Sequence, residues 1–270
     1  MTPGAVRLAA FARAGFMRLL AYRLRYVTGI LTYTINVSVY YFIWRAVYAH
    51  AAPGTELRGY ALADMVTYVA LGWIIRSFYF NNIDREIAAL VDEGQVTTYL
   101  ARPVSLLYAM TGLAAGESLF RLVAFTGPIT IVIFLLFPVG GPAGPVALAG
   151  FLASVVLSFA IFAYINFLVG MVAFATRSIA GIISAKHYTI QLLSGLLMPM
   201  AFFPDWLRTA SDFLPFRHVA HTPAAIYLGR YAGPELASAL AQQVLWAVIL
   251  LFACRRIWSR MIRRLVIQGG

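Results

Sequence analysis

The sequence of 270 residues is poor in charge, because only 11% of it is Asp, Glu, Lys or Arg, whereas 61% is hydrophobic. Soluble domains carry about 25% charged residues, so the composition excludes an ordinary soluble enzyme. Cysteine is also scarce: Cys254 stands alone, which excludes an internal disulfide, and no Cys/His cluster has the spacing of a metal site. The mean hydropathy of +0.80 places the chain in the membrane class.

The chain further lacks the G-x-x-x-x-G-K-[ST] loop that holds nucleotide phosphates, and its only lysine is Lys186. No cofactor or metal site is therefore expected in it. The net charge of +11 raises the question of nucleic-acid binding. In so apolar a chain, however, excess arginine is typical of cytoplasmic loops, so nucleic acid is not an expected partner.

Six apolar stretches are long enough to cross about 30 Å of hydrocarbon, for which about 20 residues suffice. The expected fold is therefore all-α and polytopic, with six transmembrane helices in a domain of residues 26–257. Fourteen Lys and Arg residues fall on the side of the N-terminus and four on the other, which predicts that both termini are cytoplasmic. The stretches are residues 26–49, 60–80, 106–137, 146–175, 179–203 and 236–257.

The two ends of the chain are basic. Residues 1–25 carry arginines opposite an apolar face with helical period, which predicts an amphipathic helix in the membrane interface. Residues 258–270 are expected to form a basic cytoplasmic tail. Within the third stretch, Pro128 is expected to kink the helix.

The first cytoplasmic loop, residues 81–105, contains a second amphipathic pattern. Ile83, Ile87, Leu90 and Val91 follow helical spacing, and Gly94 is suited to end the helix. A helix resting on lipid head groups would favour basic residues on its polar face, whereas this one has four acids and one arginine. The pattern therefore favours docking to a protein over docking to lipid.

The segment 204–234 is too polar to span a membrane and too rich in aromatic and aliphatic residues to be a free loop. One or two short helices are expected at the outer face, broken at Pro215 and Pro223. The segment could cap the bundle or gate the exit of a substrate, and the sequence does not decide between these.

Four charged residues lie within or beside apolar stretches. Glu117 and Arg121 have the i, i+4 spacing of a helical ion pair, at the inner interface or within the membrane. Arg76 is near the end of a stretch, and Asp64 requires a partner or water. An ion-coupled transporter or channel, the alternative function, would have to use Asp64 or Glu117.

A candidate substrate pathway comes from two stretches. Tyr33, Tyr40 and Trp44 belong to an aromatic series that could stack on a flat or cationic ligand, although interface belts and bundle packing also explain such residues. Gly195, Met198 and Pro199 make the fifth stretch soft and kinked, which suits either close helix packing or an adaptable wall.

The ordered set of these features resembles the permeases of ABC-2 type transporters. It consists of an amphipathic N-terminal helix, six spans, a cytoplasmic helix leading into EGQVTTYLARPVS (residues 93–105), and an outer segment with FPDWL and LPF. The resemblance covers nearly the whole chain. It implies an architecture like that of type V exporters, in the inner membrane of a bacterium and surrounded by membrane lipid.

The resemblance also implies partners. A second permease would form a homo- or heterodimer with this chain, with the second and fifth stretches at the seam, and two copies of a separate ATP-binding subunit would hold ATP and Mg²⁺. The helix of residues 81–94 would be the coupling helix that docks on that subunit. Its expected apolar anchors are Ile83, Ile87, Leu90 and Val91. Its expected determinants of specificity are Asp84, Glu86, Asp92 and Glu93. The expected function is ATP-driven export of a small amphipathic molecule, a drug or a lipid-like substrate.

Overall fold

The computed structural model describes residues 3–20, 24–52, 54–100, 105–176 and 178–268, and every regular element in these ranges is helical. In chain order the elements are α1 (Pro3–Leu20), α2 (Leu24–Ala49), α3 (Leu62–Tyr79), α4 (Ile83–Asp92), α5 (Val96–Leu100), α6 (Leu106–Arg121), η1 (Leu122–Thr126), α7 (Gly127–Leu136), α8 (Pro145–Gly170), η2 (Met171–Phe174), α9 (Ala180–Leu193), η3 (Met200–Phe202), α10 (Asp205–Asp212), α11 (Arg217–Tyr227) and α12 (Pro234–Gln268).

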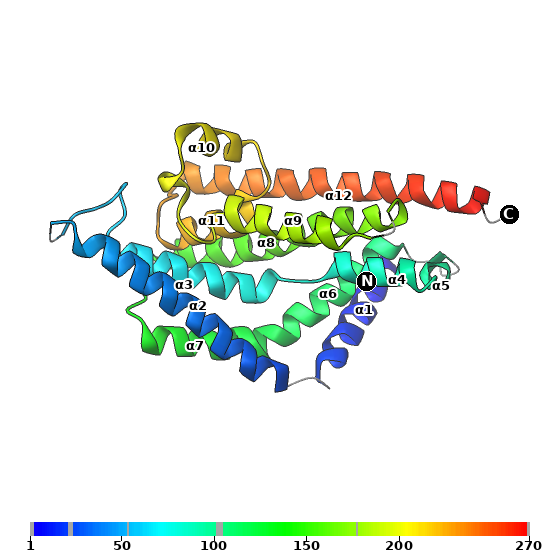
Figure 1. Ribbon diagram of the computed structural model, residues 1–270, viewed down its shortest axis with the longest axis horizontal. Coiled ribbons are helices and arrows are strands. Elements are labelled where there is room, and N and C mark those ends of the chain that lie inside the picture. Colours follow the sequence, from blue (N-terminus) through cyan, green and yellow to red (C-terminus); the bar gives the residue numbers. More distant parts are fainter. Residues whose placement is uncertain (1–2, 21–23, 53, 101–104, 177, 269–270) are drawn as a thin grey trace.

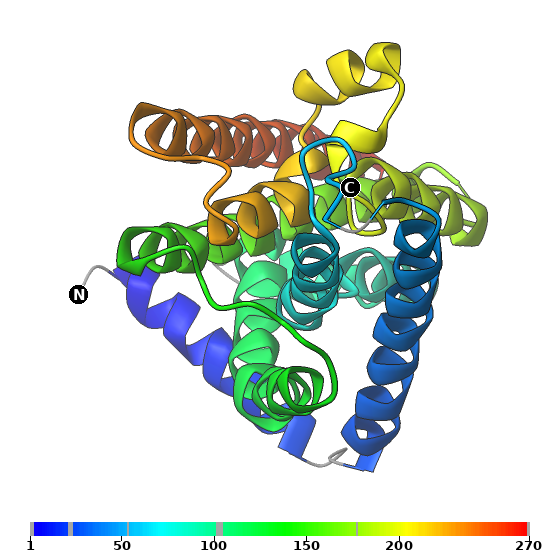
Figure 2. The same ribbon diagram turned by 90° about the vertical axis from the view of Figure 1, so that its left-hand side faces the viewer.

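The helices form an elongated bundle whose two ends differ (Figure 1). One end holds α4, α5, the start of α1 and the last turns of α12, whereas the other holds α10 and the connection from α2 to α3. Helices α11 and α12 pack on α8, and α2 packs on α3 and α7 (Figure 2). The two ends of the described chain therefore lie at the same end of the bundle as α4.

Three helices in the described ranges are long and apolar enough to cross a membrane: Leu106–Leu136, Pro145–Phe174 and Pro234–Arg263. They coincide with the third, fourth and sixth predicted stretches. Helices α2 and α3, of 26 and 18 residues, occupy the first and second stretches, and for them the crossing remains a prediction.

The sequence predicts a soft, kinked fifth stretch, and the structure interrupts the helix in the region where the kink is expected. Helix α9 ends at Leu193 after 14 residues, or about 21 Å. Gly195 then adopts a left-handed conformation with φ of 74°, and Pro199 leads into the short η3. Glycine tolerates that conformation and proline cannot continue a helix, so the two residues together interrupt the stretch.

The kink predicted at Pro128 is present. A π-helical turn, η1, precedes Gly127 and Pro128 in the third span. Proline has no N–H to donate and its ring collides with the preceding turn, and such positions are where helices bend or widen.

Helix α1 is present where the sequence predicted it, and it packs along α6. A Cβ atom on Gly15 would lie 2.2 Å from the carbonyl oxygen of Leu113, and one on Gly116 would lie 1.7 Å from that of Ala12. The two backbones thus approach each other at glycines, as in closely packed membrane helices. Within the described part of the face expected to meet lipid, Gly15 is buried and Phe11 packs against the core.

The outer segment forms two short helices, α10 and α11, as expected. The break at Pro215 is confirmed, because α10 ends at Asp212 and α11 begins at Arg217. The break expected at Pro223 is wrong, because Pro223 lies inside α11. Nearly all of α11 is buried, and it packs against α8 and α3, which holds the helix together through the proline.

Candidate coupling and transport sites

Helix α4 buries the apolar face that the sequence predicted, but it buries that face within the chain itself. Ile83 is 1% and Ile87 0% exposed. A Cβ atom on Gly170 of α8 would lie 2.9 Å from Ile87 Cδ1, so the absence of a side chain there makes room for α4. The expectation that Ile83 and Ile87 anchor another protein is therefore wrong, while Leu90 and Val91 remain half-buried.

The opposite face of α4 is exposed in the part of the chain that the structure describes. The exposed residues on this side are Arg85, Ala89, Asp92 and Glu93. They repeat the helical spacing of the apolar residues 83, 87, 90 and 91 two positions later, which places them on the opposite side of the helix. Asp92 and Glu93 give its last turn a negative surface. Of the exit 99–105 that follows, residues 101–104 lie outside the described residues.

A buried polar cluster fixes α4 to the spans. Lys186 Nζ of α9 lies 2.5 Å from Asp84 Oδ2 and donates to Asn166 Oδ1 of α8 at 2.6 Å. The Asn166 amide donates in turn to the main-chain oxygen and to Oδ1 of Asn81, at 2.9 Å each. Because Asp84 is 1% and Asn166 0% exposed, Asp84 serves this internal cluster and is not available for docking, contrary to expectation.

Arg18 of α1 joins α4 to α6. Its guanidinium lies 2.5 Å from the carboxylate of Glu86 and 2.6 Å from that of Glu117. The carboxylate of Glu117 therefore has a partner on α1, which the i, i+4 spacing to Arg121 did not predict. Arg121 reaches the main-chain oxygen of Glu117 and the hydroxyl of Ser118.

Asp64 lies at the other end of the bundle and is ion-paired. Its carboxylate is 2.7 Å from Arg230, accepts the N–H of Ala61, and is 35% exposed. A half-exposed carboxylate at a helix start resembles a capping group, and it lacks the mid-membrane burial that an ion relay needs. Since Glu117 is paired with Arg18, the ion-coupled alternative is left with no unpaired carboxylate among its two candidates.

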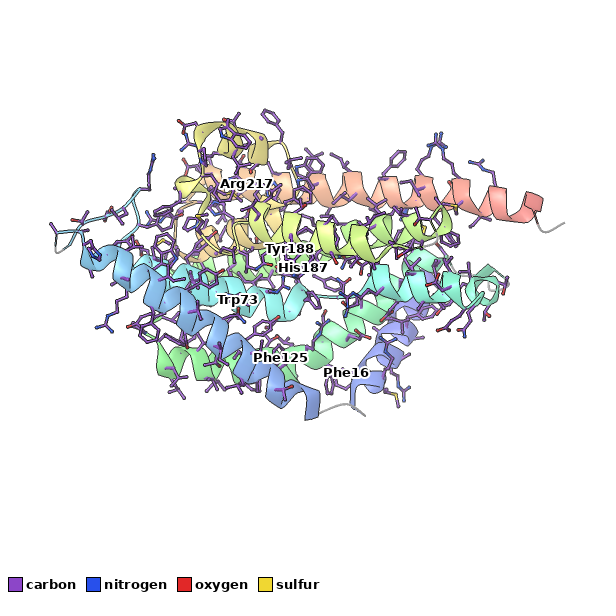
Figure 3. The ribbon with its side chains drawn as sticks, in the orientation of Figure 1. Phe16, Trp73, Phe125, His187, Tyr188 and Arg217 are labelled. Atoms are coloured by element: carbon purple, nitrogen blue, oxygen red, sulfur yellow. The ribbon has the colours of Figure 1, made fainter. Side chains whose placement is uncertain are left out.

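The candidate pathway residues are packed in the bundle. Tyr33 makes T-shaped contacts with the rings of Trp73 and Phe125, which are labelled in Figure 3, and the ring centroids are 5.3 and 5.1 Å from its own. Trp44 packs on Phe202 at 5.0 Å, and Tyr40 packs against the same core. These aromatics therefore pack against other side chains of the described core.

The remaining candidates line the ends of α3 and α9. Arg76 lies over the rings of Phe80 and Trp73, at 5.0 and 5.8 Å from their centroids. Met198 packs at the edge of the core, and Pro199 is the N-cap of η3.

Sequence reasoning missed a buried network around Gly195. The hydroxyl of Tyr68 donates to the Gly195 carbonyl oxygen at 2.7 Å and lies 2.9 Å from His221 Nδ1. Burial, and then the charge of Arg217, lowers the pKa of His221 to about 3, so its ring is neutral at pH 7. The network ties α3, α11 and the break after α9 together. Its only signal in the sequence is His221, which shares α11 with the polar residues Arg217, His218 and Thr222.

Taken together, the fold and these contacts define a helical membrane protein with an amphipathic helix held at one end of its spans. A family model described as ABC-2 family transporter protein matches residues 34–269, and the chain belongs to that family. It is thus a membrane component of an ABC transporter. A search of curated proteins found no match.

Proposed function

We propose that the chain is the permease subunit of an ATP-driven exporter that moves a small amphipathic or lipid-like molecule out of the cytoplasm or inner leaflet. Two copies of a separate ATP-binding subunit supply ATP and Mg²⁺, and a second permease completes the transporter. The architecture is that of a type V exporter in a bacterial inner membrane, with both termini in the cytoplasm. The family match and the position of α4 support this proposal.

The observation that carries the proposal is the two-sided character of α4. Ile87 and Asp84 are buried against the spans, while Arg85, Ala89, Asp92 and Glu93 form an exposed face on which the two acids exceed the one arginine. A helix held on one side and exposed on the other can dock on a partner and pass its movement to α8 and α9. Docking through charged residues gives specificity between partners.

Co-purification tests this function. The candidate ATP-binding subunit is sought among the products of neighbouring genes as a soluble protein with a phosphate-binding loop, and it is co-expressed with the tagged permease. The double variant Asp92→Lys, Glu93→Lys is expected to lose at least nine-tenths of the bound ATPase. The matched control, Glu56→Lys with Asp205→Lys, changes net charge equally at exposed residues near the other end of the bundle.

The outcome is decisive in both directions. Retention of the ATPase by wild type and control, with loss in the α4 variant, supports docking through α4. An α4 variant that is monodisperse and binds as much ATPase as the wild type contradicts it.

A further inference from the structure

A small cavity of about 290 Å³ lies between α9 and the connection from α3 to α4. Its lining consists of Phe80, Asn82 and Arg85 on one side and of Ser184, His187 and Tyr188 of α9 on the other. Figure 3 labels His187 and Tyr188. The pathway residues expected from the sequence do not line this cavity. It is therefore a candidate site separate from the pathway considered above.

The polar side chains of the lining are accessible and unpartnered. Ser184, His187 and Tyr188 share one face of α9, because they have i, i+3 and i+4 spacing. Asn82 is the N-cap of α4, but its side chain does not cap that helix. Within the described residues, none of these four side chains has a hydrogen-bond partner. They are therefore free to donate to a ligand.

Arg85 brings a positive charge into the lining. Its guanidinium is exposed and has no ion pair within the described part of the chain. The neighbouring carboxylate of Asp84 is buried and belongs to Lys186. Neither Asp nor Glu occurs among the described residues that line the cavity. An anionic ligand would thus meet a free cation and no carboxylate.

The charges around the cavity give an excess of positive charge. Those that act on the His187 ring are the positive Arg76, Arg85 and Lys186 and the negative Asp84. Lys186 and Asp84 form an ion pair and offset each other. Arg76 lies 5.0 Å from the ring centroid of the lining residue Phe80, and no carboxylate pairs with it within the described residues. Such a field raises the local concentration of anions.

The cavity lies where two functional surfaces meet. Arg85 belongs to the exposed face of α4, and Ser184 and Tyr188 belong to the exposed face of α9 that is expected at the seam. Leu192, 49% exposed, continues that face one turn beyond Tyr188. The volume is at the lower end of the usual range for ligand pockets, about 300–1,000 Å³. It suits one polar group, with an apolar chain extending out along α9.

We propose that this cavity binds the anionic head group, a phosphate or a carboxylate, of the amphipathic molecule that the transporter exports. The proposal rests on the export function proposed above and adds the charge of the substrate. Arg85 supplies the counter-charge, and the side chains of Asn82 and Ser184 donate hydrogen bonds. The apolar part of the substrate lies along Tyr188 and Leu192.

Thiol modification of the purified permease tests the charge of the cavity. Ser184→Cys, in a Cys254→Ser background and in phosphatidylcholine nanodiscs, is treated with two methanethiosulfonates, one carrying a sulfonate and one a trimethylammonium group. Relative to a free thiol, the sulfonate reagent is expected to react about tenfold faster than the cationic one. Adding Arg85→Gln is expected to lower that preference about threefold. Adding Arg208→Gln, at an exposed arginine of α10, is expected to leave it unchanged.

Protection from the same reaction tests binding. Dodecyl phosphate is expected to slow the modification of Ser184→Cys severalfold, whereas dodecyltrimethylammonium, which has the same chain and the opposite charge, is not. The matched control is Thr189→Cys, at an exposed residue of α9 outside the lining. It is expected to show neither the charge preference nor the protection, which separates the cavity from a general effect of amphiphiles on the membrane surface.

Equal rates for the two reagents in Ser184→Cys, or equal protection by the two amphiphiles, overturn the proposal. Inorganic phosphate that protects as well as dodecyl phosphate would assign the cavity to a free anion. Phosphatidylglycerol that protects as well when added to the nanodiscs would assign it to a resident lipid, and either result overturns the substrate role. Because no ATPase is present, these outcomes are independent of the co-purification that tests the proposed function.

Discussion

Lys186 and Asp84 form an ion pair of 2.5 Å that joins α9 to α4, with Asp84 almost fully buried. Such a pair adds little net stability, because taking two charges out of water costs about as much as their attraction returns. Removing one partner is different, because the other is left charged and buried. The pair therefore fixes where α4 sits on the spans.

A double-mutant cycle measures this relationship. Asp84→Leu is expected to destabilise the chain by about 3–5 kcal/mol, because Lys186 loses its counter-charge. The combined variant Asp84→Leu, Lys186→Met is expected to recover most of that loss. Thermal unfolding of the purified variants gives the comparison, and additive effects of the two substitutions would contradict the coupling.

The crossing of α1 and α6 gives a second prediction. Gly116→Ala places a Cβ atom against the main chain of α1, and overpacking of this kind costs about 1–3 kcal/mol. Gly181→Ala is the matched control, because a Cβ atom there meets open space in a helix. Melting temperatures of the two variants should differ. If Gly116→Ala melts with the wild type, α1 does not pack on α6 as described.

Acid should destabilise the region around α11. His221 has a pKa of about 3 in the folded chain, below the usual 6.5, so the unfolded state binds the extra proton. Stability is therefore full above about pH 7 and falls as the pH drops through 6.5 towards 3. His218, with a pKa of about 4, adds to the same slope.

The variant His221→Gln should show a shallower loss of melting temperature between pH 7 and 5 than the wild type. His50→Gln, at an exposed position, should keep the wild-type slope. Equal slopes in all three proteins would show that the buried histidine does not govern acid sensitivity.

The seam with a second permease is expected on α9. Helix α3, the other helix expected there, is enclosed by the chain and does not qualify. Residues 180–182, 184, 185, 188 and 189 of α9 are exposed. In a Cys254→Ser background, Ala185→Cys should cross-link to a second copy in a homodimer, whereas the exposed Val156→Cys on α8 should not. Cross-linking of both to the same extent would argue against a seam on α9.

The sequence predicted the helices more accurately than it predicted which parts of the chain pack against each helix. The spacing of Ile83 and Ile87 correctly indicated an amphipathic helix, but period alone does not say what covers the apolar face. The surface that covers this face includes Gly170, far along the chain, where the absence of a side chain makes room for α4. The sequence did not predict the polar cluster for the same reason, because Lys186 and Asn166 meet Asp84 only after α8 and α9 fold together.

A prediction from the local sequence was wrong where tertiary packing stabilises a helix. Pro223 indicated a break, yet burial against α8 and α3 keeps α11 helical through it. In the fifth stretch, by contrast, the local signal was informative, because Gly195 and Pro199, where a kink was expected, interrupt the helix. The cavity between α4 and α9 combines residues of two separate segments and has no local signal.

If the exposed face of α4 docks on an ATP-binding subunit, two adjacent alanines of this helix should differ in their distance from that subunit. Ala89 is exposed and Ala88 is 7% exposed. Each is changed to cysteine in the Cys254→Ser background and treated with a cross-linker that joins thiols to lysines of the co-expressed ATPase. We predict a permease–ATPase product from Ala89→Cys and none from Ala88→Cys. Absence of the product at Ala89, in a complex that still contains the ATPase, would contradict the claim.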